Sequence, residues 1–145
     1  MLEYKIEGMK EIDAVLKQMP EEFARKVGEA AVRKGGNVIR DRAIDYAPRD
    51  TGKLAESIYT VKQKVQGFSV AFQVGMKRGA YYAIFTEFGT AKQPAQRWFT
   101  RAFEDTKGAA FEKIIDELRK GLLRTSKRLA GKFSKSGLGA KKRRR

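Results

Sequence analysis

The chain has 145 residues and a net charge of +15, and it contains neither cysteine nor histidine. The absence of Cys and His excludes disulfides, thiol nucleophiles, imidazole acid–base chemistry and the common zinc sites. Its length suffices for one hydrophobic core, and an apolar content of 41% predicts that the chain folds instead of remaining disordered.

The N-terminal segment predicts a short strand at residues 2–6, where apolar and polar residues alternate, and Gly8 ends it. Charges recur through this segment, so it has no apolar leader core. No run of the chain approaches the about 20 apolar residues of a membrane span. We therefore expect a soluble protein that is made inside the cell and does not contact a membrane.

Two helices are expected next. Apolar residues recur at helical spacing over residues 9–19, and a second helix starts at Pro20 and continues towards Pro48. Glu21 and Glu22 suit the positive end of that helix dipole. The Gly35-Gly36 pair weakens the helix centre, and either a kink or a close helix contact would explain its presence.

Residues 57–65 and 68–76 have strand-like patterns, and Gln66-Gly67 between them predicts an antiparallel hairpin. The next run has apolar residues at 81, 84, 85 and 88, which favours a two-turn helix ended by Gly89. A last helix is expected from about residue 95 to about 124, with a candidate break at residues 106–108. Its apolar stripe comprises Trp98, Phe99, Ala102, Phe103, Ala110, Phe111, Ile114, Leu118 and Leu122.

These elements predict an α+β fold: a small antiparallel sheet packed with helices, a long C-terminal helix and a basic tail. Residues 121–145 contain ten Lys or Arg and no acid, which leaves a net charge of +5 for residues 1–120. We therefore divide the chain into one domain, residues 1–124, and a basic arm, residues 125–145. The arm is either a solubilising tail or a contact for DNA or an acidic partner. The candidate contacts are Lys132, Lys135, Lys141, Lys142, Arg143, Arg144 and Arg145.

The triplet Asp50-Thr51-Gly52 has the form of the catalytic corner of an aspartic protease. Such an enzyme needs two triplets whose close, desolvated carboxylates share a proton, and this chain has one, in a charged turn. The structural interpretation is that Pro48 ends the helix, Gly52 permits the turn, and Asp50 or Thr51 caps the next segment. Because no phosphate-binding loop or dinucleotide motif occurs either, we predict a protein without catalytic, cofactor or metal sites.

Two segments together point to a family. APRDTGKLAESI, residues 47–58, fits the pattern A-P-x-D-T-G-x-L-x-x-S-I, and YYAIFTEFGTAKQPAQRWFTRAFE, residues 81–104, contains Y-A-x-x-x-E-F-G-T. In this combination and order the segments resemble the lambdoid tail-component family of tailed bacteriophages, variously called tail completion, neck or head–tail joining proteins. The chain departs from the family at residues 96–99, Gln-Arg-Trp-Phe, where a second proline is usual.

The resemblance implies a non-enzymatic structural protein of the virion, made in the cytoplasm of a bacterial host. It would form a ring, commonly of six subunits, at the junction of head and tail. One face of the ring would cap the tail tube, and the other would dock to the head connector. The alternative is a small basic nucleic-acid-binding protein that uses its C-terminal arm.

Subunit or partner contacts are expected within the two segments, because aromatic residues and arginine are enriched at protein interfaces. Phe88 and Phe99 are instead predicted to be core. Glu87 and Arg97 are expected to form an ion pair, within one subunit or between two, and the intrasubunit pair is favoured because the residues are close in sequence. The candidate contact residues are Asp50, Thr51, Gly52, Leu54, Tyr81, Tyr82, Glu87, Gly89, Arg97, Trp98 and Arg101.

In such a ring the basic arm would either touch the phosphates of passing DNA or dock on an acidic protein surface. A strongly positive channel would hold DNA back, so docking on protein is the favoured interpretation.

Overall fold

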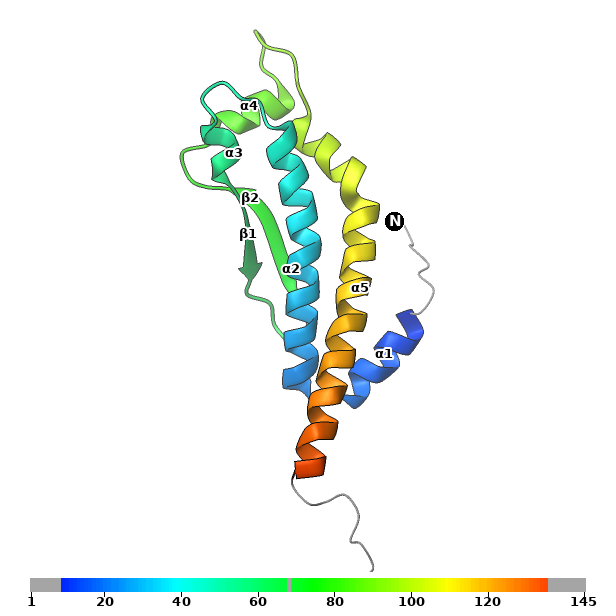
Figure 1. Ribbon diagram of the computed structural model, residues 1–145. Coiled ribbons are helices and arrows are strands. Elements are labelled where there is room, and N and C mark those ends of the chain that lie inside the picture. Colours follow the sequence, from blue (N-terminus) through cyan, green and yellow to red (C-terminus); the bar gives the residue numbers. More distant parts are fainter. Residues whose placement is uncertain (1–8, 68, 136–145) are drawn as a thin grey trace, which may run out of the picture.

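The computed structural model describes residues 9–67 and 69–135 (Figure 1). The predicted α+β class is confirmed, with one two-stranded antiparallel sheet and a long C-terminal helix among these residues. The strand predicted at residues 2–6 and the arm beyond residue 135 lie outside the described residues. The elements are α1 (Met9–Gln18), α2 (Glu21–Tyr46), α3 (Lys53–Ser57), β1 (Ile58–Gln63), β2 (Ala71–Met76), α4 (Tyr82–Phe88) and α5 (Trp98–Lys135).

The two long helices, α2 and α5, lie side by side and run in opposite directions (Figure 1). They approach closely at Gly35, where an added Cβ would lie 2.4 Å from Ile114 Cγ1 and 3.0 Å from the carbonyl oxygen of Ala110. Of the two explanations for the Gly35-Gly36 pair, the close helix contact is therefore confirmed. A side chain at position 35 would separate the helices.

Helix α5 differs from its prediction in two ways. It begins at Trp98 and continues without a break to Lys135, so the candidate break at 106–108 and the end near residue 124 were wrong. Thr106 is buried and donates a hydrogen bond from Oγ1 to the carbonyl oxygen of Ala102, 2.5 Å away. This bond satisfies the hydroxyl, so the polar side chain can be buried without interrupting the helix. The division of the chain at residue 124 stays a prediction, and α5 runs across it.

The predicted apolar stripe of α5 was too wide. Ala102 and Ala110 are buried, whereas their neighbours Phe103 and Phe111 are exposed. Consecutive helical residues are rotated by roughly 100°, so the alanine and the phenylalanine cannot both face α2. At the close approach to Gly35 it is Ala110 that faces α2, and Phe111 is turned outwards.

The hairpin packs on α2, on the side away from α5 (Figure 1). Its register pairs Ile58 with Met76 and Gln63 with Ala71, and Gly67 has a φ of 72° in the connecting turn, as predicted for the hairpin. An ion pair between Lys62 and Glu29 joins β1 to α2.

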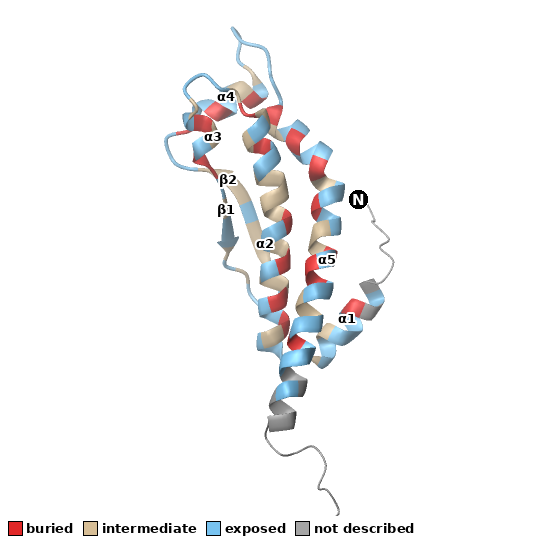
Figure 2. Cartoon of the chain, viewed as in Figure 1, coloured by how far each residue is buried: buried red, intermediate tan, exposed pale blue. Residues whose placement is uncertain are grey.

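Two clusters of buried residues hold these elements together, and Figure 2 colours buried positions red along the helices. The first, near α4, combines residues of α2, α3, β1, α4 and α5 with Ala80. The second lies where α1 covers the two long helices and comprises Ile12, Val27, Ala31, Ile115 and Leu118. The first cluster fixes the position of α4 against α2, α3 and α5.

A buried carboxylate adds a polar link between the long helices. The side chain of Glu117 on α5 is 5% exposed and accepts a 2.7 Å hydrogen bond from Lys34 on α2. Lys113 lies 3.3 Å away and Arg124 3.8 Å away. The Lys34 hydrogen bond is the main reason why the pKa of Glu117 lies below its ordinary value of 4.5, although burial opposes it.

We expect this link to make stability depend on pH. Because the pKa of Glu117 is lowered in the folded state, its stabilising contribution is complete above about pH 4.5 and is lost as the pH falls through the folded pKa. Glu117→Gln should therefore lower the thermal unfolding midpoint by several degrees at pH 7. The difference from the wild type should shrink towards zero in acid. Glu112→Gln, at an exposed acid of the same helix, is the control and should show little difference at either pH.

Candidate protein-docking site on α4

Helix α4 and the residue before it turn their large side chains towards solvent. Tyr81 and Phe88 are each 71% exposed, Ile84 54%, Phe85 50% and Tyr82 38%, and these five side chains form what we name the α4 face. The opposite side of the helix is set by Ala83 and Glu87, one turn apart, which are buried. Isolated exposed apolar residues are ordinary on proteins, but a contiguous group of five indicates an interaction surface.

Glu87 anchors α4 to the start of α5. Its carboxylate accepts hydrogen bonds from the backbone N–H of Phe99 at 2.8 Å and of Thr100 at 3.0 Å, and from the Thr100 hydroxyl. These N–H groups lie at the positive end of the α5 dipole, which stabilises the buried negative charge. The acid is thus the N-terminal cap of α5.

The favoured ion pair between Glu87 and Arg97 within one subunit was therefore wrong, while a pair between two subunits stays a prediction. The backbone N–H of Arg97 donates to the carbonyl oxygen of Glu87, 3.1 Å away, while the exposed guanidinium forms no ion pair among the described residues. Helix N–H groups satisfy the carboxylate, so it needs no cation. The residues do meet within one subunit, but through the main chain.

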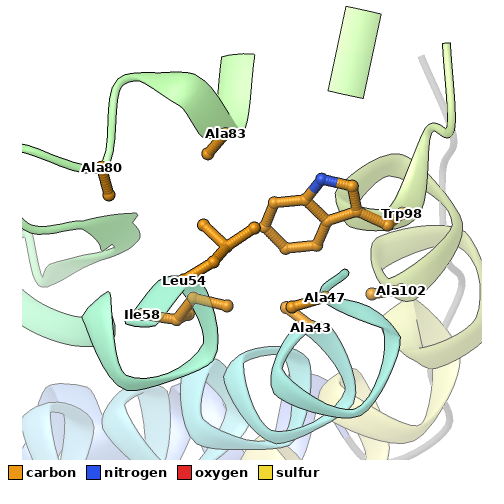
Figure 3. Close-up of a cluster of buried hydrophobic side chains, with 8 residues drawn as sticks. All are labelled: Ala43, Ala47, Leu54, Ile58, Ala80, Ala83, Trp98 and Ala102. Carbon is orange, nitrogen blue, oxygen red and sulfur yellow. The ribbon is translucent and has the colours of Figure 1, made fainter. Parts of the chain in front are cut away.

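Trp98 completes the anchor from the α5 side. It is 1% exposed, and its Nε1 donates a hydrogen bond to Thr86 Oγ1 on α4, 3.1 Å away. Figure 3 shows its ring between the side chains of α2, α3, α4 and α5, most of which are alanines. Trp98 and Leu54, both predicted as contacts with another subunit, are fully buried within the chain, and their contact role stays a prediction.

Gly89 ends α4 as predicted and allows the chain to return. Its φ is 78°, and an added Cβ would lie 2.7 Å from the backbone nitrogen of Ala95. Only glycine fits both the left-handed conformation and this close approach. The turn that follows brings Gln96 back to α4, where its N–H donates to the carbonyl oxygen of Thr86, 2.9 Å away.

The segment Asp50-Thr51-Gly52 lies beside the α4 face. Its residues line a shallow pocket together with Tyr82, so the structure brings these predicted contact residues together. Asp50 and Thr51 are exposed, and Gly52, with a φ of 76°, is the N-terminal cap of α3. No side chain caps α3, so the prediction that Asp50 or Thr51 does so was wrong.

Arg101 lies one helical turn beyond Arg97 and is occupied within the chain. Its guanidinium lies over the ring of Tyr46, 5.5 Å from the centroid, and Arg42 contacts the same ring at 5.6 Å. The Tyr46 hydroxyl donates to Asp105, 2.6 Å away, and this hydrogen bond is the main reason why the pKa of Tyr46 is raised. This cluster ties the end of α2 to α5.

Sequence reasoning missed part of the α4 face. Phe88 was predicted to be core and is among its most exposed residues, while Ile84 and Phe85 were used only as evidence for a helix. Phe99 is half-buried and packs edge-on against Trp98, with ring centroids 5.6 Å apart, so it lies at the core margin. The available signal was the spacing of Ala83 and Glu87, which mark the buried side.

The protein family described as "Bacteriophage HK97-gp10, putative tail-component" matches residues 10–89, which include α1 to α4 and more than half of the chain. The chain belongs to this family. It is therefore a bacteriophage tail component, as the two sequence segments predicted. The match ends at Gly89, immediately after the α4 face. No curated protein and no solved structure matches the chain.

Within the described part of this tail component, no helix combines the length and apolarity needed to cross a membrane. The same residues contain no group of three or more acidic side chains placed to hold a metal ion.

Proposed function

We propose that this tail component is a structural protein of the virion that forms a ring at the head–tail junction, completes the tail tube and joins it to the head connector. The family supports a structural role in the phage tail. The observation that carries the proposal is the α4 face, five large apolar side chains exposed on one helix that is anchored at Glu87 and Trp98. A rigid apolar surface of this kind suits a permanent contact between virion proteins.

The anchoring matters because assembly contacts lose affinity when surfaces must first be ordered. The carboxylate of Glu87 on α4 accepts hydrogen bonds from the start of α5, and the indole of Trp98 on α5 donates one to α4. The two carbonyl oxygens of Thr86 and Glu87 accept further bonds from the returning chain. We infer that α4 is presented in one orientation before any partner arrives.

The mass of the purified full chain tests this proposal. We expect light scattering at moderate salt to detect either a closed ring or a monomer that forms a ring only when tail tubes of the same phage are added. Electron microscopy should then show the ring at tube ends. A monomer that is indifferent to tubes and to tailless heads would contradict the junction role.

A second candidate is a nucleic-acid-binding protein, favoured by the ten basic residues and no acid in residues 121–145. Lys127 and Arg128 are exposed on α5, Lys132 and Lys135 lie on the same helix, and residues 141–145 lie outside the described residues. This candidate predicts binding of the isolated chain to short duplex DNA, with affinity falling steeply as salt rises. Binding of that kind without any response to tubes would replace the junction role.

The α4 face gives a specific expectation for attachment. Phe85→Ser combined with Phe88→Ser should weaken co-sedimentation with tail tubes or heads by at least about tenfold, since two exposed apolar anchors are lost. Because both side chains are exposed, the fold should remain intact by circular dichroism. Leu123→Ser, which removes a 62% exposed apolar side chain from α5, is the matched control and should leave attachment unchanged. Equal attachment of all three proteins would exclude the α4 face as the contact.

A further inference from the structure

The α4 face is surrounded by cations that the chain itself does not neutralise. Within the described residues, five exposed basic side chains close to α4 form no ion pair, and we name them the basic rim. Its members are Lys53, Lys77, Arg78, Lys92 and Arg97.

The rim reaches both ends of α4. Lys53, Lys77 and Arg78 line one pocket together with Tyr82 at the start of the helix. At the other end, the N–H of Arg97 bonds to Glu87, and Lys92 lies in the turn after Gly89. The exposed acids nearby are Asp50 and Glu56, beside Lys53, so the surroundings of the face stay positively charged.

Elsewhere in the described chain ten Lys and Arg side chains form ion pairs, while others, such as Arg33 and Lys64, form none. Lys34 bonds to Glu117 and Lys62 to Glu29, and intrahelical pairs such as Lys120 with Asp116 occur along the long helices. Five unpaired cations around an apolar face are the complement of a surface with an apolar centre and acidic edges.

We propose that the α4 face docks on a different structural protein of the junction, whose contact surface is apolar at its centre and acidic at its edge. This inference rests on the proposed function and names the chemistry of the partner. A second α4 face is unsuitable, because two basic rims would face each other. Acids on α5 such as Glu104 and Asp116 are already paired with Lys107 and Lys120, so they are poor complements for the rim.

Cations beside aromatic rings also suit single-stranded nucleic acid, whose bases stack on such rings. One observation and one general argument favour protein. Ile84, an aliphatic residue, occupies the α4 face between the tyrosines and Phe88, and offers no stacking surface. The faces of paired bases in duplex DNA are covered by their neighbours, so aromatic side chains on a helix surface gain little from it.

The test is a charge reversal of the full-length chain, Lys77→Glu combined with Arg78→Glu. Its control is Arg33→Glu combined with Lys64→Glu, which makes the same change in net charge at exposed cations outside the rim that form no described ion pair. Circular dichroism and thermal unfolding establish that both variants fold. Each protein is mixed with tail tubes assembled without this chain and with DNA-filled heads that lack tails, and binding is measured by co-sedimentation at two salt concentrations.

We expect the rim variant to bind its partner at least about tenfold more weakly than the control at low salt, and to lose most of the salt dependence of the wild type. Its ring mass by light scattering should equal that of the wild type. Undiminished binding of the rim variant would overturn the inference alone, while wild-type protein that binds neither tubes nor heads would overturn the proposed function as well.

Two further outcomes would also overturn the inference. A rim variant that no longer forms rings would show that the face joins copies of this chain. Binding of single-stranded DNA by the wild type that is lost in the rim variant, but kept in the control, would assign the face to nucleic acid.

Discussion

Trp98→Ala is expected to lower the free energy of unfolding by about 3–5 kcal/mol, a large part of the about 5–15 kcal/mol typical of a whole domain. Trp98 is 1% exposed and is surrounded mainly by alanine side chains, among them Ala43, Ala83 and Ala102. These neighbours are short extensions of helix backbones, so they cannot collapse into the space that the indole leaves. The cavity would persist, and with it the full cost of the substitution.

Urea unfolding at 25 °C measures this change, and Phe88→Ala is the control because it removes an aromatic ring that is 71% exposed. The control should change stability by no more than about 0.5 kcal/mol. Trp98 is the single tryptophan of the chain, so the fluorescence of the wild type reports directly on this core. Equal stabilities of the two variants would contradict the burial of Trp98.

Gly35→Ala is expected to destabilise the protein by about 1–3 kcal/mol, although alanine is the better helix former. The new methyl group would lie 2.4 Å from Ile114 Cγ1 and 3.0 Å from the carbonyl oxygen of Ala110. The Ile114 side chain can rotate, but the backbone carbonyl can move only if α5 shifts away from α2. The substitution therefore weakens the packing of α2 against α5 along the whole helix pair.

Gly108→Ala is the matched control. Gly108 lies inside α5, is exposed, and has no atom within 4 Å of an added Cβ. Without a steric cost, only the helix preference remains, and the substitution should stabilise the protein by about 0.5–1 kcal/mol. The two glycine-to-alanine changes should thus have opposite signs in urea unfolding, and a shared sign would contradict the close contact at Gly35.

Much of this fold follows from local patterns. The hairpin, the long helix that ends before Pro48 and the short helix that ends at Gly89 are each specified by periodicity and by turn or cap residues within the segment itself. The family was readable from two segments for the same reason. Local patterns also predicted that these segments would carry the contacts, and Tyr81 and Tyr82 do lie on the α4 face.

The errors arose where two segments meet. Phe103 was assigned to the apolar stripe together with Ala102, yet only Ala102 is buried. Glu87 was paired with a cation because charge suggested it, whereas the helix that begins at Trp98 offers backbone donors that no composition reveals. The size and charge of a side chain can be read from the sequence. Its burial also depends on the space and the hydrogen-bond donors that a neighbouring helix provides.

Helix α5 is continuous from Trp98 to Lys135. Its 38 residues at about 1.5 Å each give a rod of about 57 Å, which is joined to α4 at one end and reaches the basic part of the chain at the other. Because Glu87 and Trp98 join that rod to α4, a displacement of α4 would be carried along the helix axis. Two proteins bound at the opposite ends of α5 would therefore stay at a constant distance from each other.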